Sequence, residues 1–195
     1  MKIPSHRRQN GFTLVELLVV ITIIAVLAGA GFAAGNAAIQ KAKKTTALAT
    51  ATAIETAINN FYTEYGAMPT TASTDETVRT DSNTTLLKIL LGLEGAGTGT
   101  LNTRNIKFLS VREGKANKNG LMYEGTGGTT VKGLYDPWGG GFNVILDADY
   151  DERVLPKPAA GTAPTLNGRR AAVWSNGADG VRGTGGLASD DVKTW

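Results

Sequence analysis

One carboxylate lies inside the most apolar part of this sequence. Glu16 follows the boundary Asn10-Gly11-Phe12, and residues 17–40 behind it carry no charge. A lone carboxylate in a membrane helix costs on the order of 2.5–3.5 kcal/mol. In such a helix Glu16 therefore needs a partner or a function.

A cut after Gly11 would supply the partner. The new amine of Phe12 would lie within one helical turn of Glu16, so the two groups could pair inside one subunit. In a stack of identical helices, Glu16 could pair instead with the amine of a neighbouring copy, and one buried pair per contact would fix the axial register. The alternative is an interfacial glutamate whose carboxylate only reaches the lipid head groups.

Two acidic stretches later in the chain could hold a metal ion. The first contains Asp147, Asp149, Asp151 and Glu152. It begins like an EF-hand loop, but its sixth position is Glu152 rather than Gly and its twelfth is Pro158 rather than Glu, so it does not fit that loop. Alternating carboxylates at a strand end are expected to be solvated charges that prevent edge pairing.

The second acidic stretch lies near the C-terminus, where Asp179 and Asp191 flank a glycine-rich segment. Calcium takes about six to eight oxygen ligands, including backbone carbonyls, and glycines let the backbone fold around the ion. A polar, frayed chain end is the alternative. The terminal Trp195 favours a docked end instead.

The composition favours no enzymatic site. The chain has no cysteine and one histidine, His6, which excludes thiolate zinc sites and Cys/His catalysis. Residues 95–99 are rich in glycine but are not followed by the Gly-Lys-Ser/Thr of a phosphate-binding loop. The net charge of +3 comes from Lys2, Arg7 and Arg8, so it gives no reason to expect binding to nucleic acid.

One long helix must position the N-terminal residues. Residues 17–40 are long enough to span a hydrocarbon core of roughly 30 Å as a helix, and the cations before them place the start in the cytoplasm. Apolar residues then recur at steps of four and three, which predicts an amphipathic continuation. This stripe consists of Ala47, Ala51, Ile54, Ile58, Phe61 and Tyr65. Gly66 and Pro69 predict that the helix ends near Tyr65.

Beyond this helix the pattern predicts a short second helix and a small sheet. Asp81 or Ser82 could cap a helix with an apolar side at residues 86–91, which the glycines from Gly92 onward would end. Runs typical of strands lie at residues 106–111, 142–146 and 171–174. This order predicts an α+β fold, with a small antiparallel sheet packed on the stripe of the long helix.

The N-terminal sequence resembles the signature of type IV pilins and type II secretion pseudopilins. After a basic start, the residues that carry the resemblance are Gly11-Phe12-Thr13-Leu14-Val15-Glu16-Leu17-Leu18-Val19-Val20-Ile21. In this family a membrane peptidase cuts after the glycine and methylates the new N-terminal phenylalanine. The resemblance implies that Gly11 ends a leader, Phe12 is methylated and Glu16 is the carboxylate that guides assembly.

Two further segments resemble the major pseudopilins of type II secretion. Residues 135–142 are similar to their Asp-Pro-Trp-Gly turn, and residues 175–195 are similar to their C-terminal calcium loop. The similarity implies side-chain ligands from Asp179 and Asp191, and an acidic ligand that aligns with either Ser189 or Asp190. It also implies that calcium is bound by the backbone carbonyls of Asn176 and Val181.

The resemblance implies a structural, non-enzymatic subunit of a fibre anchored in the bacterial inner membrane. Residues 1–11 would be the leader, 12–35 the transmembrane assembly helix and 36–195 a periplasmic domain, with the N-terminus in the cytoplasm. The implied partners are a prepilin peptidase/methyltransferase, copies of the same chain, minor pseudopilins and an inner-membrane assembly platform, with calcium as cofactor.

Two other functions remain open. A type IV pilus or competence pilin, for adhesion or DNA uptake, would be expected to show a basic patch or a cysteine-closed loop. The lack of cysteine and the equal numbers of acidic and basic residues after the leader count against it. The second alternative is an uncleaved single-pass anchor that presents a periplasmic binding module.

Overall fold

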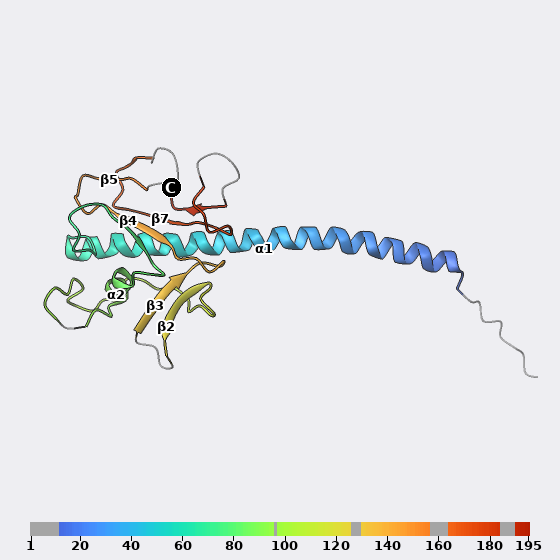
Figure 1. Cartoon of the computed structure of the whole chain (residues 1–195), viewed down its shortest axis with the longest axis horizontal. Coiled ribbons are helices and arrows are strands. Elements are labelled where there is room, and N and C mark those ends of the chain that lie inside the picture. Colours follow the sequence, from blue (N-terminus) through green and yellow to red (C-terminus); the bar gives the residue numbers. More distant parts are fainter. Residues whose placement is uncertain (1–11, 96, 126–129, 157–163, 184–189) are drawn as a thin grey trace, which may run out of the picture. The chain divides into compact units, whose positions relative to one another are not determined.

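The computed structural model describes residues 12–95, 97–125, 130–156, 164–183 and 190–195 (Figure 1). The chain divides into two compact units, Met1–Lys41 and Ala42–Trp195. Helix α1 (Leu14–Tyr65) runs through both units. The second unit also holds the other described helix and the described strands.

Helix α1 confirms the predicted long helix and its end. It is continuous over 52 residues, and its apolar N-terminal part is long enough to cross a membrane by length and composition. It stops at Tyr65 because Gly66 adopts φ 69° and donates its N–H to the carbonyl of Tyr62 at 2.8 Å. A left-handed glycine of this kind ends helices because it has no Cβ to strain.

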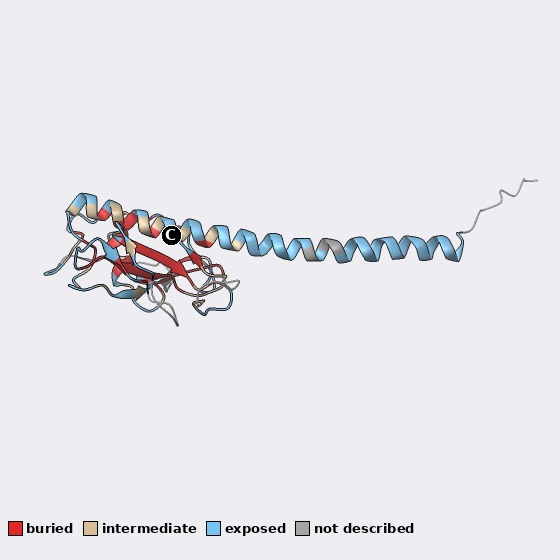
Figure 2. Ribbon diagram, turned by 90° about the horizontal axis from the view of Figure 1, so that it is seen from above, coloured by how far each residue is buried: buried red, intermediate tan, exposed pale blue. Residues whose placement is uncertain are grey.

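The two halves of α1 differ sharply in burial. In the first unit every described side chain is exposed, whereas one face of the helix is buried from Ala47 onward (Figure 2). The predicted stripe is confirmed, because Ala47, Ala51, Ile54 and Ile58 are fully buried and Phe61 is 1% exposed. Burial of this stripe provides much of the hydrophobic stabilisation of the second unit.

A four-stranded antiparallel sheet in the order β1-β4-β7-β8 packs on this stripe. Its strands are β1 (Thr77–Arg79), β4 (Asn143–Leu146), β7 (Ala171–Ser175) and β8 (Val192–Lys193). Val144 pairs with Val173 in the register, and both belong to the core cluster that contains Ile54 and Phe61. The α+β class and the predicted strands at 142–146 and 171–174 are therefore confirmed.

The alternate residues of the same strands form a second, smaller core. Ile145, Ala172 and Trp174 cluster with Val154, and Trp195 packs against them. Val154 lies in a short ribbon made of β5 (Arg153–Val154) and β6 (Leu166–Asn167). Since side chains alternate across a strand, this cluster covers the sheet face opposite α1. The C-terminal tryptophan is docked, as expected from the sequence.

One predicted strand in this unit is wrong, and one hairpin was not predicted. Residues 106–111 form no strand; the N–H groups of Phe108 and Leu109 both donate to the carbonyl of Leu90, each at 2.9 Å. That carbonyl is at the end of helix α2 (Thr85–Leu91), so the segment closes a helix end instead of joining a sheet. Strands β2 (Gly120–Glu124) and β3 (Thr130–Tyr135) form a hairpin that was not predicted.

The predicted cap of α2 is also wrong. Neither Asp81 nor Ser82 caps this helix. The Asn83 side chain accepts the N–H of Thr85 at 3.0 Å, and Asp81 instead accepts hydrogen bonds from Arg79 and from the N–H of Gly141. The predicted end is right, because Gly92 adopts a left-handed conformation directly after Leu91. Asp81 is occupied because its neighbour Arg79 offers a stronger, charge-assisted hydrogen bond.

A single buried carboxylate fixes the turn between β3 and β4. Asp136 is 1% exposed, and its Oδ1 accepts the N–H groups of Trp138, Gly139 and Gly140 at 2.7–2.9 Å. Its Oδ2 accepts the hydroxyl of Ser175 at 2.5 Å. One side chain therefore joins β3, the turn and β7. Trp138 in this turn is half-buried and packs against the core.

We predict that Asp136→Ala strongly destabilises the second unit. The change leaves the N–H groups of the turn without their acceptor, which costs about 3 kcal/mol or more and lowers Tm by roughly 6–12 °C. Asp136→Asn keeps one acceptor oxygen and should lose less. Thermal unfolding of the full chain in detergent measures this, with the exposed Glu124→Ala as control. Equal melting of Asp136→Ala and the control would contradict the assigned role.

Candidate functional site

The first candidate site is the start of α1, where Thr13 and Glu16 bind each other. The backbone N–H and the hydroxyl of Thr13 donate to Glu16 Oε2 at 2.9 and 2.7 Å. The N–H of Glu16 donates in return to the Thr13 hydroxyl oxygen at 3.3 Å. This reciprocal arrangement is a capping box, which satisfies two of the N–H groups that a helix start leaves free.

The capping box places the carboxylate of Glu16 at the positive end of the helix dipole. Among the described residues, its other oxygen, Oε1, has no hydrogen-bond donor and can accept one from an amine. The local partner expected from the sequence was the amine of Phe12, whereas the structure shows Thr13 as the donor to Glu16. The signal was present, because Thr-x-x-Glu before an apolar run is the sequence pattern of a capping box. Gly11 lies outside the described residues.

The helix behind the capping box presents an apolar surface on all sides. Its large apolar side chains from Phe12 to Ile39 are between 46% and 82% exposed. A helix that is apolar all round requires lipid or other helices around it. The only acidic side chain of the first turn is Glu16, so this carboxylate is the polar feature that such surroundings would meet.

The second candidate site is the loop between β7 and β8. Asp190 reaches across it, because its Oδ2 accepts the N–H groups of Ala178 and of Asp179, the latter at 3.2 Å. Asp191 Oδ2 accepts the N–H of Gly183 at 3.0 Å. Three of the predicted calcium ligands, Asp179, Asp190 and Asp191, thus accept backbone N–H groups of this loop. Among the described residues, the carboxylates that lie close enough to share a metal ion are those of Asp75, Asp147 and Asp149.

Gly177 makes this close approach possible. It adopts φ 69°, and a Cβ on it would lie 2.5 Å from the carboxyl carbon of Asp190. The Asn176 side chain supports the loop by donating to the carbonyl of Gly180 and accepting from Asn143, both at 3.1 Å. Val181 donates its N–H to Asp179 Oδ1 at 2.8 Å. Ser189 lies outside the described residues.

The chemistry of this loop suits a hard cation. Carboxylate and carbonyl oxygens on a glycine-rich backbone are the donors that calcium prefers. The carboxylates presently accept backbone N–H groups, so a calcium ion would replace those donors. A cationic side chain is also near, because Arg182 stacks over Trp174 with 4.1 Å between Cζ and the ring centroid. Burial lowers the pKa of Arg182, and the charge of Asp191 opposes this shift.

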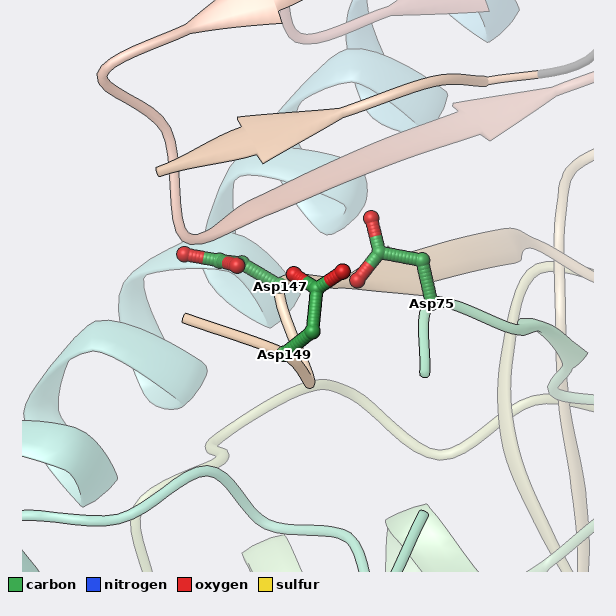
Figure 3. Close-up of side chains that lie close together, drawn as sticks. All are labelled: Asp75, Asp147 and Asp149. Atoms are coloured by element: carbon green, nitrogen blue, oxygen red, sulfur yellow. The ribbon is translucent and has the colours of Figure 1, made fainter. Parts of the chain in front are cut away.

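The third group is an acidic cluster at the far end of β4, formed by Asp75, Asp147 and Asp149 (Figure 3). One carboxylate oxygen from each lies within 4.8 Å of the others. Asp147 is 2% exposed and accepts the N–H groups of Asp151 and Glu152 at 3.1 and 3.2 Å. The expectation of solvated edge charges is therefore wrong for Asp147, which closes the β4–β5 loop, and right for the exposed Asp149, Asp151 and Glu152.

Asp75 joins this cluster from a distant part of the chain. It accepts the N–H of Ala148 at 2.9 Å. Burial raises the pKa of both Asp75 and Asp147, and the other carboxylates of the cluster raise it further. An acid whose pKa is higher in the folded state holds its proton more tightly there. The two groups therefore favour folding below their raised pKa values and disfavour it above them.

We predict that Asp149→Asn stabilises the chain at neutral pH. Removing one charge relieves the repulsion on Asp75 and Asp147, which should add roughly 0.5–1 kcal/mol and raise Tm by about 1–4 °C. The gain should vanish in acid, where the cluster is protonated. Melting of the full chain in detergent and chelator across a pH series measures this, with Glu124→Gln as control. A gain that persists unchanged in acid would rule out the electrostatic cause.

A family model described as the prokaryotic N-terminal methylation motif matches residues 6–32. No curated protein and no solved structure matches the chain. The matched stretch contains the Gly11–Phe12 boundary, the capped Glu16 and the first turns of α1. The motif implies processing by a prepilin peptidase, pilus-type assembly and a structural rather than an enzymatic role. With the apolar helix behind it, the motif supports a membrane-anchored, single-pass prepilin of the type IV pilin-like kind.

Proposed function

We propose that this chain is a structural subunit of a pseudopilus, the membrane-anchored helical fibre that drives protein secretion across the outer membrane in type II secretion. The observation that carries the proposal is the methylation motif at residues 6–32, with Glu16 capped at the start of an apolar helix. Residues 1–11 are the leader, 12–35 span the inner membrane, and residues 36–195 form the periplasmic domain.

The geometry at Glu16 suggests how subunits are held before and during assembly. In a single subunit, Thr13 supplies two donors to Glu16 Oε2, which reduces the cost of a carboxylate in lipid. Cleavage after Gly11 adds a cationic amine on Phe12 beside it. Oε1 can then accept from the methylated amine of a neighbouring copy without loss of the capping box. Each new copy is thereby placed in one axial register.

The preference for a pseudopilus over an adhesive or DNA-binding pilus is supported by charge and by the C-terminal loop. The cations Lys2, Arg7 and Arg8 of the leader account for the whole positive excess, and the chain has no cysteine to close a loop. The domain has instead an oxygen-rich loop at Asp179, Asp190 and Asp191. We infer that calcium binds this loop through these carboxylates, with Ser189 as the alternative to Asp190 and with the carbonyls of Asn176 and Val181.

The partners follow from this function. A prepilin peptidase/methyltransferase processes the N-terminus, an inner-membrane platform adds subunits, and copies of the chain together with minor pseudopilins form the fibre. A type IV pilus would use the same N-terminal chemistry. Deleting the gene separates the two, because loss of secreted proteins indicates a pseudopilus, whereas loss of adhesion or DNA uptake with normal secretion indicates a pilus.

One test of the proposed function concerns processing of the N-terminus. Mass spectrometry of the membrane-bound chain should find Phe12 as a methylated N-terminus, because the motif places the cut after Gly11. Gly11→Val should leave the leader attached, since a bulky side chain would block the peptidase. Gly29→Ala, in open space on the same helix, is the matched control and should be processed normally. An unmethylated wild-type chain that begins at Met1 would instead support the uncleaved anchor.

Another test of the proposed function concerns calcium. At about 100 times the dissociation constant, bound calcium adds about 2.7 kcal/mol and raises Tm by roughly 5–11 °C over a sample in chelator. Asp179→Ala should abolish this shift. Asp149→Ala should retain it, because Asp149 belongs to the other carboxylate group. No shift in the wild type would reject the calcium loop. A shift lost only in Asp149→Ala would place the ion in the acidic cluster instead.

A further inference from the structure

An exposed turn before β2 carries cations that repel one another. Lys115 and Lys118 exchange backbone hydrogen bonds at 3.0 and 3.1 Å, and Ala116 and Asn117 between them have φ of 54° and 55°. These are the features of a two-residue hairpin turn of the type I′ kind. Residues paired in this way project their side chains from the same face, and like charges directly opposite each other are destabilising.

The charge of this turn is not neutralised by its own surroundings. Arg112 is exposed beside it and donates its Nε–H to the carbonyl of Asn119 at 2.8 Å. Within the described residues, neither Lys115 nor Lys118 takes part in an ion pair. The one carboxylate in this stretch, Glu113, lies near the Tyr123 phenol. Arg112, Lys115 and Lys118 are called the basic turn below.

The acidic cluster at Asp75, Asp147 and Asp149 carries an excess of negative charge. Asp151 adds a fourth, exposed carboxylate, and among the described residues no cation forms an ion pair with any of these four groups. The arginines that follow β6 have other partners, because Arg169 binds Glu55 at 2.9 Å and Arg170 stacks over the Tyr62 ring at 4.4 Å. Arg153, after the cluster, is exposed.

The two charged groups lie at opposite ends of β4. Gly139, shortly before β4, lies against the basic turn, because a Cβ on it would be 3.4 Å from Lys118 Cε. Asp147 follows Leu146, the last residue of the strand. Four residues of strand span roughly 13 Å, so the two groups of one molecule do not meet. Each group therefore presents exposed charge that a partner from outside the molecule can neutralise.

We propose that the basic turn of one copy docks on the acidic cluster of another copy. A second copy carries the complementary charge for each group. A contact between two different surfaces of identical molecules propagates head to tail, and it builds an open filament when the rotation between copies does not close into a ring. This interface rests on the proposed function, and it adds a specific contact between the domains to the register set by Glu16.

The absence of cysteine from the chain gives a direct test. Lys115→Cys and Asp149→Cys are introduced together in the full chain, which is expressed with a prepilin peptidase and oxidised in isolated membranes. The expected result is a ladder of disulfide-linked dimers, trimers and higher multimers, because each copy would bond to two neighbours. Lys132→Cys with Asp149→Cys is the matched control, since Lys132 is exposed on β3 outside the basic turn. A chain with only Lys115→Cys or only Asp149→Cys can form one disulfide, so it should give no species larger than a dimer.

Charge reversal tests the electrostatic cause. Lys115→Glu with Lys118→Glu, in the chain without introduced cysteines, should lower the fibre yield roughly five-fold or more, given several ion pairs per contact. Combining these with Asp149→Lys and Asp151→Lys should restore at least half of the yield, because the contact then has reversed polarity. High salt should weaken the wild-type contact in the same way.

The outcomes separate this interface from the function on which it rests. Fibres in electron micrographs without a ladder, or reversed charges that fail to restore assembly, would overturn the interface and leave the pseudopilin proposal intact. If the double-cysteine chain gives no ladder and the Lys115→Glu/Lys118→Glu chain loses binding to phosphatidylglycerol vesicles, the basic turn is assigned to lipid. Absence of fibres and of N-terminal processing in the wild type would overturn both proposals.

Discussion

The rest of the structure depends on one helix that must serve two environments. Every described side chain of α1 in the first unit is exposed, yet from Ala47 onward a stripe of the same helix is fully buried under the sheet. The helix is continuous through this change, because only the surroundings of its side chains differ between the two parts. Small residues at Ala47 and Ala51, followed by Ile54, Ile58 and Phe61, let the sheet approach the helix closely and then fill the core between them.

The parts of the fold that the sequence predicted are those set by local periodicity. The stripe of α1, its end at Gly66 and the strands β4 and β7 follow from apolar spacing and a glycine stop. The segment 106–111 has the composition of a strand, but its N–H groups bind the carbonyl of Leu90, a partner that spacing cannot reveal. Hairpin β2–β3 was missed because its glycines lower the strand signal, while its pairing decides the structure.

The same difference between local patterns and contacts of distant segments applies to the candidate sites. Gly11, Phe12 and Glu16 belong to a contiguous motif that the family model also matches, and Thr13 could have been predicted, since the capping box spans four neighbouring residues. The meeting of Asp75 with Asp147 could not, because β1 and β4 pair across a long stretch of sequence. Asp147 looked solvated for this reason; its burial comes from a loop that folds back onto it.

Carboxylates that accept backbone N–H groups recur throughout this cysteine-free domain. Asp136 accepts three N–H groups, while Asp147, Glu94 and Asp190 accept two each. Each such contact joins segments that a disulfide could otherwise link, and hydrogen bonds to a charged acceptor are about twice as strong as neutral ones. Unlike a disulfide, a carboxylate can exchange its donors for a cation. The groups that organise the loops of a single subunit are therefore also those able to bind calcium, a terminal amine or the lysines of a neighbouring copy.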